Sequence, residues 1–78
     1  MKATLNKHPI AVITGASSGL GEAFAYALAN EGYRLILLAR RKERLKEIQS
    51  KVLTDCQIHQ VDLSNLNAVN DILKKLPS

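Results

Sequence analysis

The chain has 78 residues, about half the length of a typical domain, so it holds one small domain or a part of a larger one. Its composition, 46% hydrophobic and 23% charged, is close to ordinary globular averages and excludes a disordered tail, a collagen-like repeat and a coiled coil. The hydrophobic core of so small a domain gives only marginal stability unless other segments add to it.

The charge balance gives a first indication of binding partners. Eleven Lys and Arg against seven Asp and Glu give a net charge of +4. Many of the bases lie in residues 40–51, together with Glu43 and Glu47, a pattern more typical of a solvated helix face than of a phosphate-binding run. One Phe and two Tyr supply too few aromatic rings for stacking on bases, so we expect no nucleic-acid partner.

Three features of the sequence indicate the cellular compartment and the chance of a metal site. They are the cysteine content, the histidine content and the lengths of the apolar runs. The single cysteine, Cys56, excludes an internal disulfide, fits the reducing cytoplasm, and is expected to be a buried or half-buried thiol. The longest apolar run, residues 35–39, cannot span a bilayer, and residues 1–9 lack a secretory apolar region, so we expect no membrane partner. His8 and His59 have no ligand partners at suitable spacing, and we predict no metal site.

The first half of the chain predicts a strand followed by a helix. The apolar run at residues 10–14, between Pro9 and Gly15, is typical of a strand buried on both faces. From Gly19 the apolar residues recur at helical spacing, and Gly32 stands where a left-handed C-terminal cap belongs. The predicted apolar face of this helix consists of Leu20, Ala23, Phe24, Ala27 and Leu28.

The remainder predicts two more strands and two more helices. Residues 35–39 form a second strand, and a charged helix follows with Leu45, Ile48 and Val52 on one face. Residues 57–62 form a weaker, more polar strand, and Ser64 is placed to cap a third helix that Pro77 stops. The apolar stripe of that helix consists of Leu66, Val69, Ile72, Leu73 and Leu76.

The resulting β-α-β-α-β-α order predicts an α/β fold, the amino-terminal half of a doubly wound (Rossmann) parallel sheet with strand order 3-2-1. The polar third strand is a natural edge. The first strand is also an edge in this order, although its apolar sequence favours neighbours on both sides. We therefore expect residues 1–78 to be a partial dinucleotide-binding domain, the amino-terminal half of a single-domain enzyme whose fourth strand would lie beside the first.

A glycine-rich segment, Thr-Gly-Ala-Ser-Ser-Gly-Leu-Gly at residues 14–21, joins the first strand to the first helix. Successive glycines permit a sharp turn at Gly15, a close approach of backbone to pyrophosphate at Gly19, and close helix packing at Gly21. The free N–H groups of the first helical turn then face the anion. Ser17 and Ser18 either bind phosphate or ribose oxygens or cap the helix.

The end of the second strand carries the sequence Ala39-Arg40-Arg41, with no acid before Glu43. In a nucleotide fold of this kind an acid here pairs with the 2′-hydroxyl of the adenosine ribose, whereas an arginine accommodates a 2′-phosphate. Arg40 and Arg41 therefore predict NADP as the cofactor rather than NAD. The alternative, that both merely begin a basic helix, is disfavoured because cations are unfavourable at a helix N-terminus.

Three segments together resemble the short-chain dehydrogenase/reductase family: the glycine-rich segment, Leu-Leu-Ala-Arg-Arg-Lys-Glu-Arg-Leu at residues 37–45, and Val-Asp-Leu-Ser at residues 61–64. The resemblance implies that Asp62 accepts a hydrogen bond from the adenine amino group, with Leu63 beside the ring. Spacing alone leaves Asp62 equally well explained as a loop acid near a helix start. The resemblance also implies that the pyrophosphate and ribose are lined by Gly15, Ser17, Ser18, Leu20 and Gly21.

The catalytic segments of that family are missing from this sequence. The family uses Asn-Asn-Ala-Gly, a serine and a Tyr-x-x-x-Lys pair, whereas Tyr26 and Tyr33 are followed at the fourth position by Asn30 and Leu37. We read both tyrosines as packing residues and predict no catalytic residue.

The resemblance implies an NADP-dependent oxidoreductase that transfers hydride between nicotinamide and a small carbonyl or alcohol substrate and works as a homo-oligomer. The 78-residue chain alone is expected to be inactive. The motifs also fit a second interpretation, a non-catalytic nucleotide-binding or interaction module that a partner chain completes.

Overall fold

The structure, a computed structural model, describes residues 9–76, so His8 and Pro77 lie outside the described residues. Its elements are β1 (Ile10–Thr14), α1 (Gly19–Asn30), β2 (Arg34–Ala39), α2 (Lys42–Lys51), β3 (Cys56–Gln60) and α3 (Leu66–Lys74). The strands are parallel and β2 lies between β1 and β3. This order confirms the predicted α/β fold and the strand order 3-2-1.

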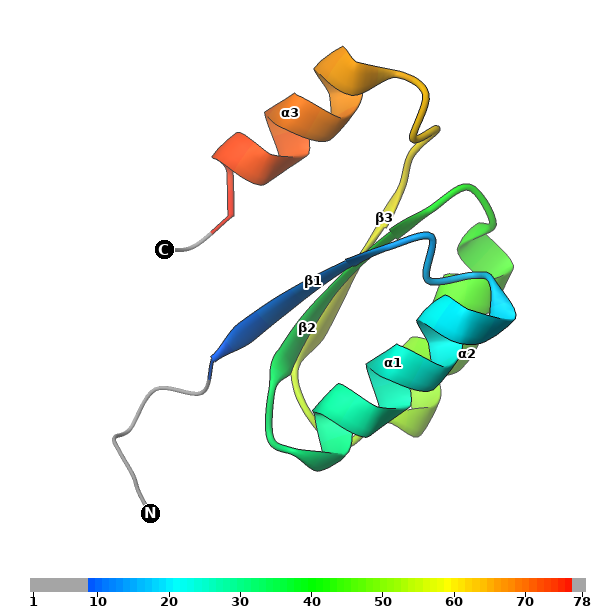
Figure 1. Cartoon of the computed structure of the whole chain (residues 1–78), viewed down its shortest axis with the longest axis vertical. Helices are drawn as coiled ribbons and strands as arrows, with labels where there is room; N and C mark the ends of the chain where they lie inside the picture. The colour runs from blue at the N-terminus through cyan, green and yellow to red at the C-terminus, as the bar shows by residue number, and fades with distance from the viewer. Residues whose placement is uncertain (1–8, 77–78) are drawn as a thin grey trace.

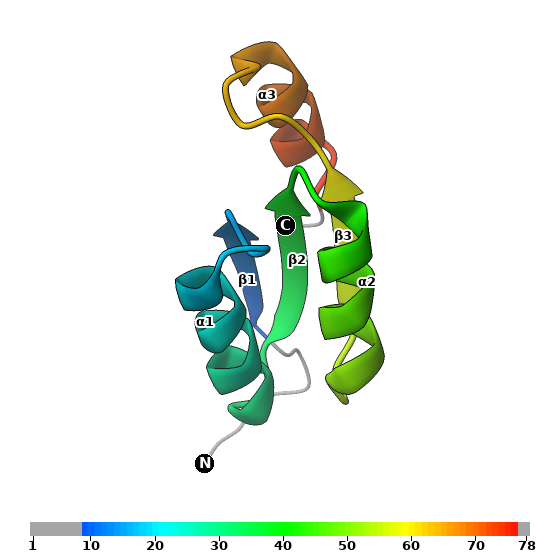
Figure 2. The same ribbon diagram turned by 90° about the vertical axis from the view of Figure 1, so that its right-hand side faces the viewer.

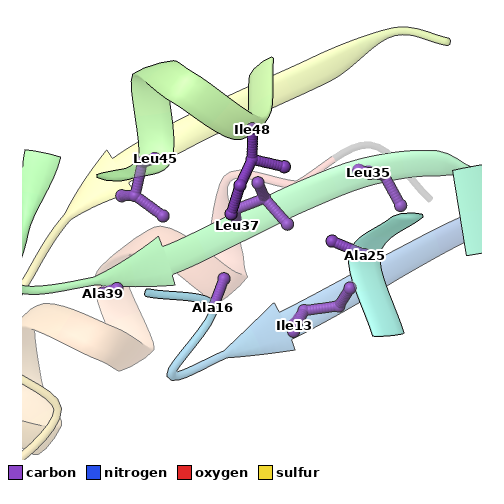
Figure 3. Close-up of a cluster of buried hydrophobic side chains, with 8 residues drawn as sticks. All are labelled: Ile13, Ala16, Ala25, Leu35, Leu37, Ala39, Leu45 and Ile48. Atoms are coloured by element: carbon purple, nitrogen blue, oxygen red, sulfur yellow. The ribbon is translucent and has the colours of Figure 1, made fainter. Parts of the chain in front are cut away.

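The elements form three layers. Helices α1 and α2 lie side by side on one face of the sheet, and α3 lies on the other face near the carboxyl ends of the strands (Figures 1 and 2). The main core fills the space between the sheet and the α1–α2 layer (Figure 3). It consists of Ile13, Ala16, Ala25, Leu35, Leu37, Ala39, Leu45 and Ile48.

A smaller apolar cluster holds α3 on the opposite face. Alternate residues of β2 point to the two sides of the sheet, so Ile36 and Leu38 join Val61 beneath α3 while their neighbours join the main core. Ala68, Val69, Ile72 and Leu76 pack against this cluster, but α3 itself has no fully buried residue. Strand β2 is therefore buried on both faces, as its continuous apolar sequence predicts.

The prediction that the first strand is buried on both faces is wrong for the described residues. Within residues 9–76, β1 pairs only with β2, and Val12 is 41% exposed while Ile13 is 9% exposed. The apolar sequence of β1 reflects a preference for neighbours that this part of the chain does not supply.

The predicted apolar face of the first helix is also wrong. Leu20 and Phe24 are 71% and 55% exposed, whereas Gly21 and Ala25 are the buried residues of α1. The helix turns its small residues to the sheet, and Leu28 is the one residue of the predicted face that packs against the core. At the other end α1 stops as predicted: Gly32 has φ +91°, and the Tyr33 N–H donates to the Leu28 carbonyl.

The two later helices agree more closely with the sequence. In α2, Leu45 and Ile48 are buried, and Val52 packs beside them. In α3 the predicted stripe is confirmed except for Leu66 and Leu73, which are exposed. The cap of α3 is Asn65, whose side chain accepts from the Ala68 N–H at 3.1 Å, and not Ser64, because the Ser64 hydroxyl is turned back to Asp62.

Candidate functional site

A cavity of about 430 Å³ lies where the carboxyl ends of the three parallel strands meet their following loops. In open α/β sheets this edge is where ligands bind, since the loops after neighbouring strands converge there. The cavity is lined by Gly15, Ser17, Ala39, Arg40, Arg41 and Leu63. Each strand contributes, because Gly15 follows β1, Ala39 ends β2 and Leu63 follows β3.

The loop after β1 turns sharply at Gly15. This residue has φ +70°, a left-handed conformation that residues with a Cβ rarely adopt. Its N–H donates to the Leu38 carbonyl of β2 at 2.8 Å, and its own carbonyl accepts from the Ser18 N–H at 3.0 Å and the Ser18 hydroxyl at 2.8 Å. The loop is therefore tied to the central strand on one side and to the start of α1 on the other.

Gly21 serves packing and does not line the cavity. A Cβ at this position would overlap the Gly15 carbonyl oxygen and lie 2.9 Å from the Ala16 Cα. The first turn of α1 therefore rests directly on the loop backbone, as predicted for the last glycine of the motif. At Gly19 a Cβ would meet no protein atom within 4 Å, so that glycine borders open space.

The two serines of the loop have different surroundings. Ser18 is the N-cap of α1, and its hydroxyl accepts from the Gly21 N–H at 3.3 Å, so the capping alternative describes it in this structure. Ser17 lines the cavity. Within residues 9–76, the N–H groups of Ser17, Gly19 and Leu20 donate to no protein acceptor, which leaves them available to an anion.

The basic wall of the cavity is formed by Arg40 and Arg41. Both are exposed, and neither forms an ion pair with a carboxylate in the described part of the chain. Arg41 is also the N-cap of α2 but makes no side-chain capping bond. The Gln60 side-chain amide donates to the Arg40 carbonyl at 3.2 Å and links this turn to the end of β3.

Asp62 and Leu63 follow β3 at the same edge. The Ser64 hydroxyl and backbone N–H donate to Asp62 Oδ1 at 2.7 and 3.0 Å. These hydrogen bonds, with a smaller contribution from the positive charge of Arg40, lower the pKa of the exposed Asp62 carboxyl. Within residues 9–76, Oδ2 accepts no hydrogen bond, so one oxygen of a carboxylate held in its charged form is free.

The structure thus brings five of the ten predicted site residues into one cavity: Gly15, Ser17, Arg40, Arg41 and Leu63. The other five, Ser18, Gly19, Leu20, Gly21 and Asp62, lie in the loops and the first helical turn beside it. Ala39 and Gln60 were not among the predicted site residues. The position of Ala39, a small residue at the end of a buried strand, could have indicated it, whereas no local signal indicates Gln60, whose bond spans 20 residues of sequence.

Comparison with known proteins bears directly on this site. The family model described as short chain dehydrogenase matches residues 9–78. The chain belongs to this family. The match includes the glycine-rich loop, the Arg40–Arg41 turn and the loop after β3, and so covers every residue that lines the cavity.

Individual short-chain dehydrogenases match at moderate identity. An uncharacterised oxidoreductase of Staphylococcus epidermidis is 38% identical over 68 residues, which is 87% of this chain and 30% of that protein. The NADP-dependent 3-hydroxy acid dehydrogenase YdfG of Escherichia coli is 33% identical over 88% of this chain and 28% of its own length. The chain thus spans less than a third of these two relatives.

A solved dehydrogenase structure has a similar fold. An alcohol dehydrogenase from the archaeon Thermococcus sibiricus, complexed with 5-hydroxy-NADP, superposes with a TM-score of 0.76 and 40% identity. The superposition covers 88% of this chain and 31% of that protein.

Residues outside the cavity mostly agree with the structural roles expected of them. In this short-chain dehydrogenase chain, Cys56 is a half-buried free thiol, and burial raises its pKa to about 11, so it is protonated at neutral pH. Tyr26 and Tyr33 pack against the main core. No helix in residues 9–76 is long and apolar enough to cross a membrane.

Proposed function

We propose that this chain is the adenosine-binding part of an NADP-dependent short-chain oxidoreductase. The observation that carries the proposal is the juxtaposition, across one cavity, of a glycine loop and two arginines. Among residues 9–76, the loop has N–H groups without acceptors, and the arginines have no ion-pair partners. The free amides suit a pyrophosphate, and the guanidinium groups suit a 2′-phosphate. The names of YdfG and of the archaeal complex, which both mention NADP, support the same choice of cofactor.

The residues present fit such a cofactor in three places. Gly15, Ser17 and the first turn of α1 would hold the pyrophosphate, and Arg40 and Arg41 would hold the 2′-phosphate. Asp62, with Oδ2 free and its pKa lowered, would accept from the adenine amino group while Leu63 packs beside the ring. When bound, the cofactor would supply hydride chemistry, and this chain's share would be binding and orientation.

The proposal also covers the reaction of a complete protein. A complete protein of this kind would transfer hydride between nicotinamide and a small carbonyl or alcohol, and would assemble as a homo-oligomer. The 78-residue sequence contains no Tyr-x-x-x-Lys pair, so we expect this chain alone not to catalyse hydride transfer. Residues 1–78 remain proposed as part of one dinucleotide-binding domain. We also propose a cytoplasmic location, which fits a sequence whose one cysteine, Cys56, cannot form an internal disulfide.

The test is the binding of NADP and NAD to the chain and to the variant Arg40→Asp. The variant removes a charged hydrogen bond to the 2′-phosphate and offers an acceptor to a 2′-hydroxyl. We expect NADP to bind roughly tenfold to a hundredfold more weakly and NAD to bind more tightly, measured by isothermal titration calorimetry.

Lys46→Asp is the matched control, because Lys46 is an exposed base of α2 that does not line the cavity. It makes the same charge change and is expected to leave the ratio of the two affinities unchanged. Equal weakening of NADP and NAD by Arg40→Asp would contradict the assignment of the 2′-phosphate to Arg40. Failure of the unsubstituted chain to bind either dinucleotide would overturn the proposed function.

A further inference from the structure

An ion pair joins the first turns of α1 and α2, outside the cavity. Arg44 Nη2 lies 2.7 Å from Glu22 Oε1, and the two residues are 22 positions apart in the sequence. Arg44 and Glu22 side chains are 43% and 22% exposed, so the pair is partly shielded from water. Arg44 does not line the cavity, although Arg40 and Arg41 do.

Both partners are held in place by further hydrogen bonds. The Tyr26 hydroxyl donates to Glu22 Oε2 at 3.2 Å, so both oxygens of the Glu22 carboxylate are engaged. Arg44 Nη1 donates to Glu47 Oε1 at 3.2 Å. A network of this kind restricts the side-chain geometry more than an isolated surface pair does.

The pair connects the two walls of the cavity. The Glu22 N–H donates to the Ser18 carbonyl at 2.9 Å, one turn after the glycine loop. On the other side, the Leu45 N–H, next to Arg44, donates to the Arg41 carbonyl at 3.2 Å. The Glu22–Arg44 contact therefore links the helix that follows the glycine loop to the helix that follows the Arg40–Arg41 turn.

The charges explain why the contact matters at this point. Arg44 lies in the first turn of α2, where a cation is unfavourable and where no side chain caps the helix. Glu22 pairs with Arg44 and directs it toward α1. Without Glu22, Arg44 would keep only its 3.2 Å contact with Glu47 on its own helix, and this network would no longer join α2 to α1.

We propose that Glu22 and Arg44 are positioning residues that hold the Arg40–Arg41 turn at the distance from the glycine loop that suits a dinucleotide with a 2′-phosphate. The inference rests on the proposed function. It adds that discrimination between NADP and NAD depends on a contact between helices, made by residues that touch neither cofactor.

The test compares Glu22→Gln, Arg44→Gln and the double variant for binding of NADP and NAD by calorimetry. If only net charge mattered, Glu22→Gln would tighten NADP binding, because it removes a negative charge near an anion site. If Glu22 positions the turn, the same variant weakens NADP binding. We expect each variant, including the charge-neutral double variant, to weaken NADP about fivefold or more and NAD less than about twofold.

Glu31→Gln and Arg34→Gln make the same charge changes at the other end of the molecule and are expected to leave the NADP-to-NAD ratio unchanged. Tighter NADP binding by Glu22→Gln would overturn the inference. Equal weakening of NADP and NAD would also overturn it, because it would show that the ion pair only stabilises the fold. If the charge variants unfold, Tyr26→Phe repeats the test, because it removes the hydroxyl that donates to Glu22 Oε2 without changing the net charge. NADP binding should again weaken more than NAD binding. Failure of the unsubstituted chain to bind NADP would overturn the proposed function and this inference together.

Discussion

At the scale of single residues, Asp62 is held in one arrangement by its neighbour Ser64. Its Oδ1 accepts two hydrogen bonds from Ser64, and its Oδ2 is left open within the described chain. Both bonds favour the ionised carboxyl, whose free oxygen would be the stronger acceptor for the adenine amino group in the proposed complex. The local Asp-x-Ser spacing is enough to create this arrangement, because the bonds span two residues.

Replacing Ser64 with Ala should raise the pKa of Asp62 toward its ordinary value. The hydroxyl bond is the largest contribution to the lowered pKa and would be lost, while the backbone N–H bond would remain. Since a lowered pKa means that the folded state binds the proton less readily, this contribution to stability is present above the unfolded pKa. It is lost as the pH falls through the folded pKa.

The measurement is an NMR titration of the Asp62 carboxyl carbon between neutral and acidic pH. Ser50→Ala is the control, since the Ser50 hydroxyl donates to the Glu47 carbonyl and not to Asp62. An Asp62 titration curve that is unchanged in Ser64→Ala would show that the hydroxyl does not set its pKa.

At the scale of elements, the position of α1 depends on its smallest residues. The helix buries Gly21 and Ala25 and leaves Leu20 and Phe24 exposed, because only small side chains allow its first turn to rest on the Gly15 carbonyl. This contact sets the position of the helix start, which in turn presents the free N–H groups at the cavity edge.

Gly21→Ala should therefore destabilise the fold by about 1–3 kcal/mol, the usual cost of overpacking against backbone that cannot yield. The added Cβ would overlap the Gly15 carbonyl oxygen, so α1 must shift away from the loop. Urea unfolding followed by circular dichroism measures the change. Gly19→Ala is the matched control: its Cβ meets nothing within 4 Å, and its stability should stay within about 0.5 kcal/mol of the unsubstituted chain. Equal stability of the two variants would contradict the packing role of Gly21.

At the scale of the whole molecule, the β1 edge of the sheet has an apolar border. Leu20 and Phe24 are exposed on α1, and Val12 is 41% exposed on the opposite face of β1, whose outer edge carries no partner within residues 9–76. Exposed apolar residues beside a bare strand edge favour self-association.

We expect the isolated chain to associate in a concentration-dependent way, and Phe24→Lys to reduce this association by placing a charge in the apolar border. Sedimentation velocity over a range of concentrations measures the effect. Asn30→Lys adds the same charge at the last residue of α1 and should leave association unchanged. Identical sedimentation of the chain and Phe24→Lys would show that this border does not mediate association.

The sequence by itself determined the order of elements and the parallel sheet. Periodicity and glycine placement are local, and parallel strands bring the loops that follow them to one edge whatever the details of packing. The sequence could therefore assign Gly15, Ser17, Arg40 and Arg41 to one place, whereas Leu63 was assigned to it only through the family resemblance and Ala39 was not predicted.

Only the tertiary structure decided which residues of each element face the core and which long-range contacts link the elements around the cavity. The sequence predicts that Leu20 and Phe24 face the core, whereas the close approach of Gly21 to the loop, which a larger residue would prevent, turns Gly21 and Ala25 inward. The bonds from Gln60 to Arg40 and from Arg44 to Glu22 span 20 and 22 residues. Contacts of that kind depend on how strands and helices are brought together in space, and no spacing along the chain encodes them.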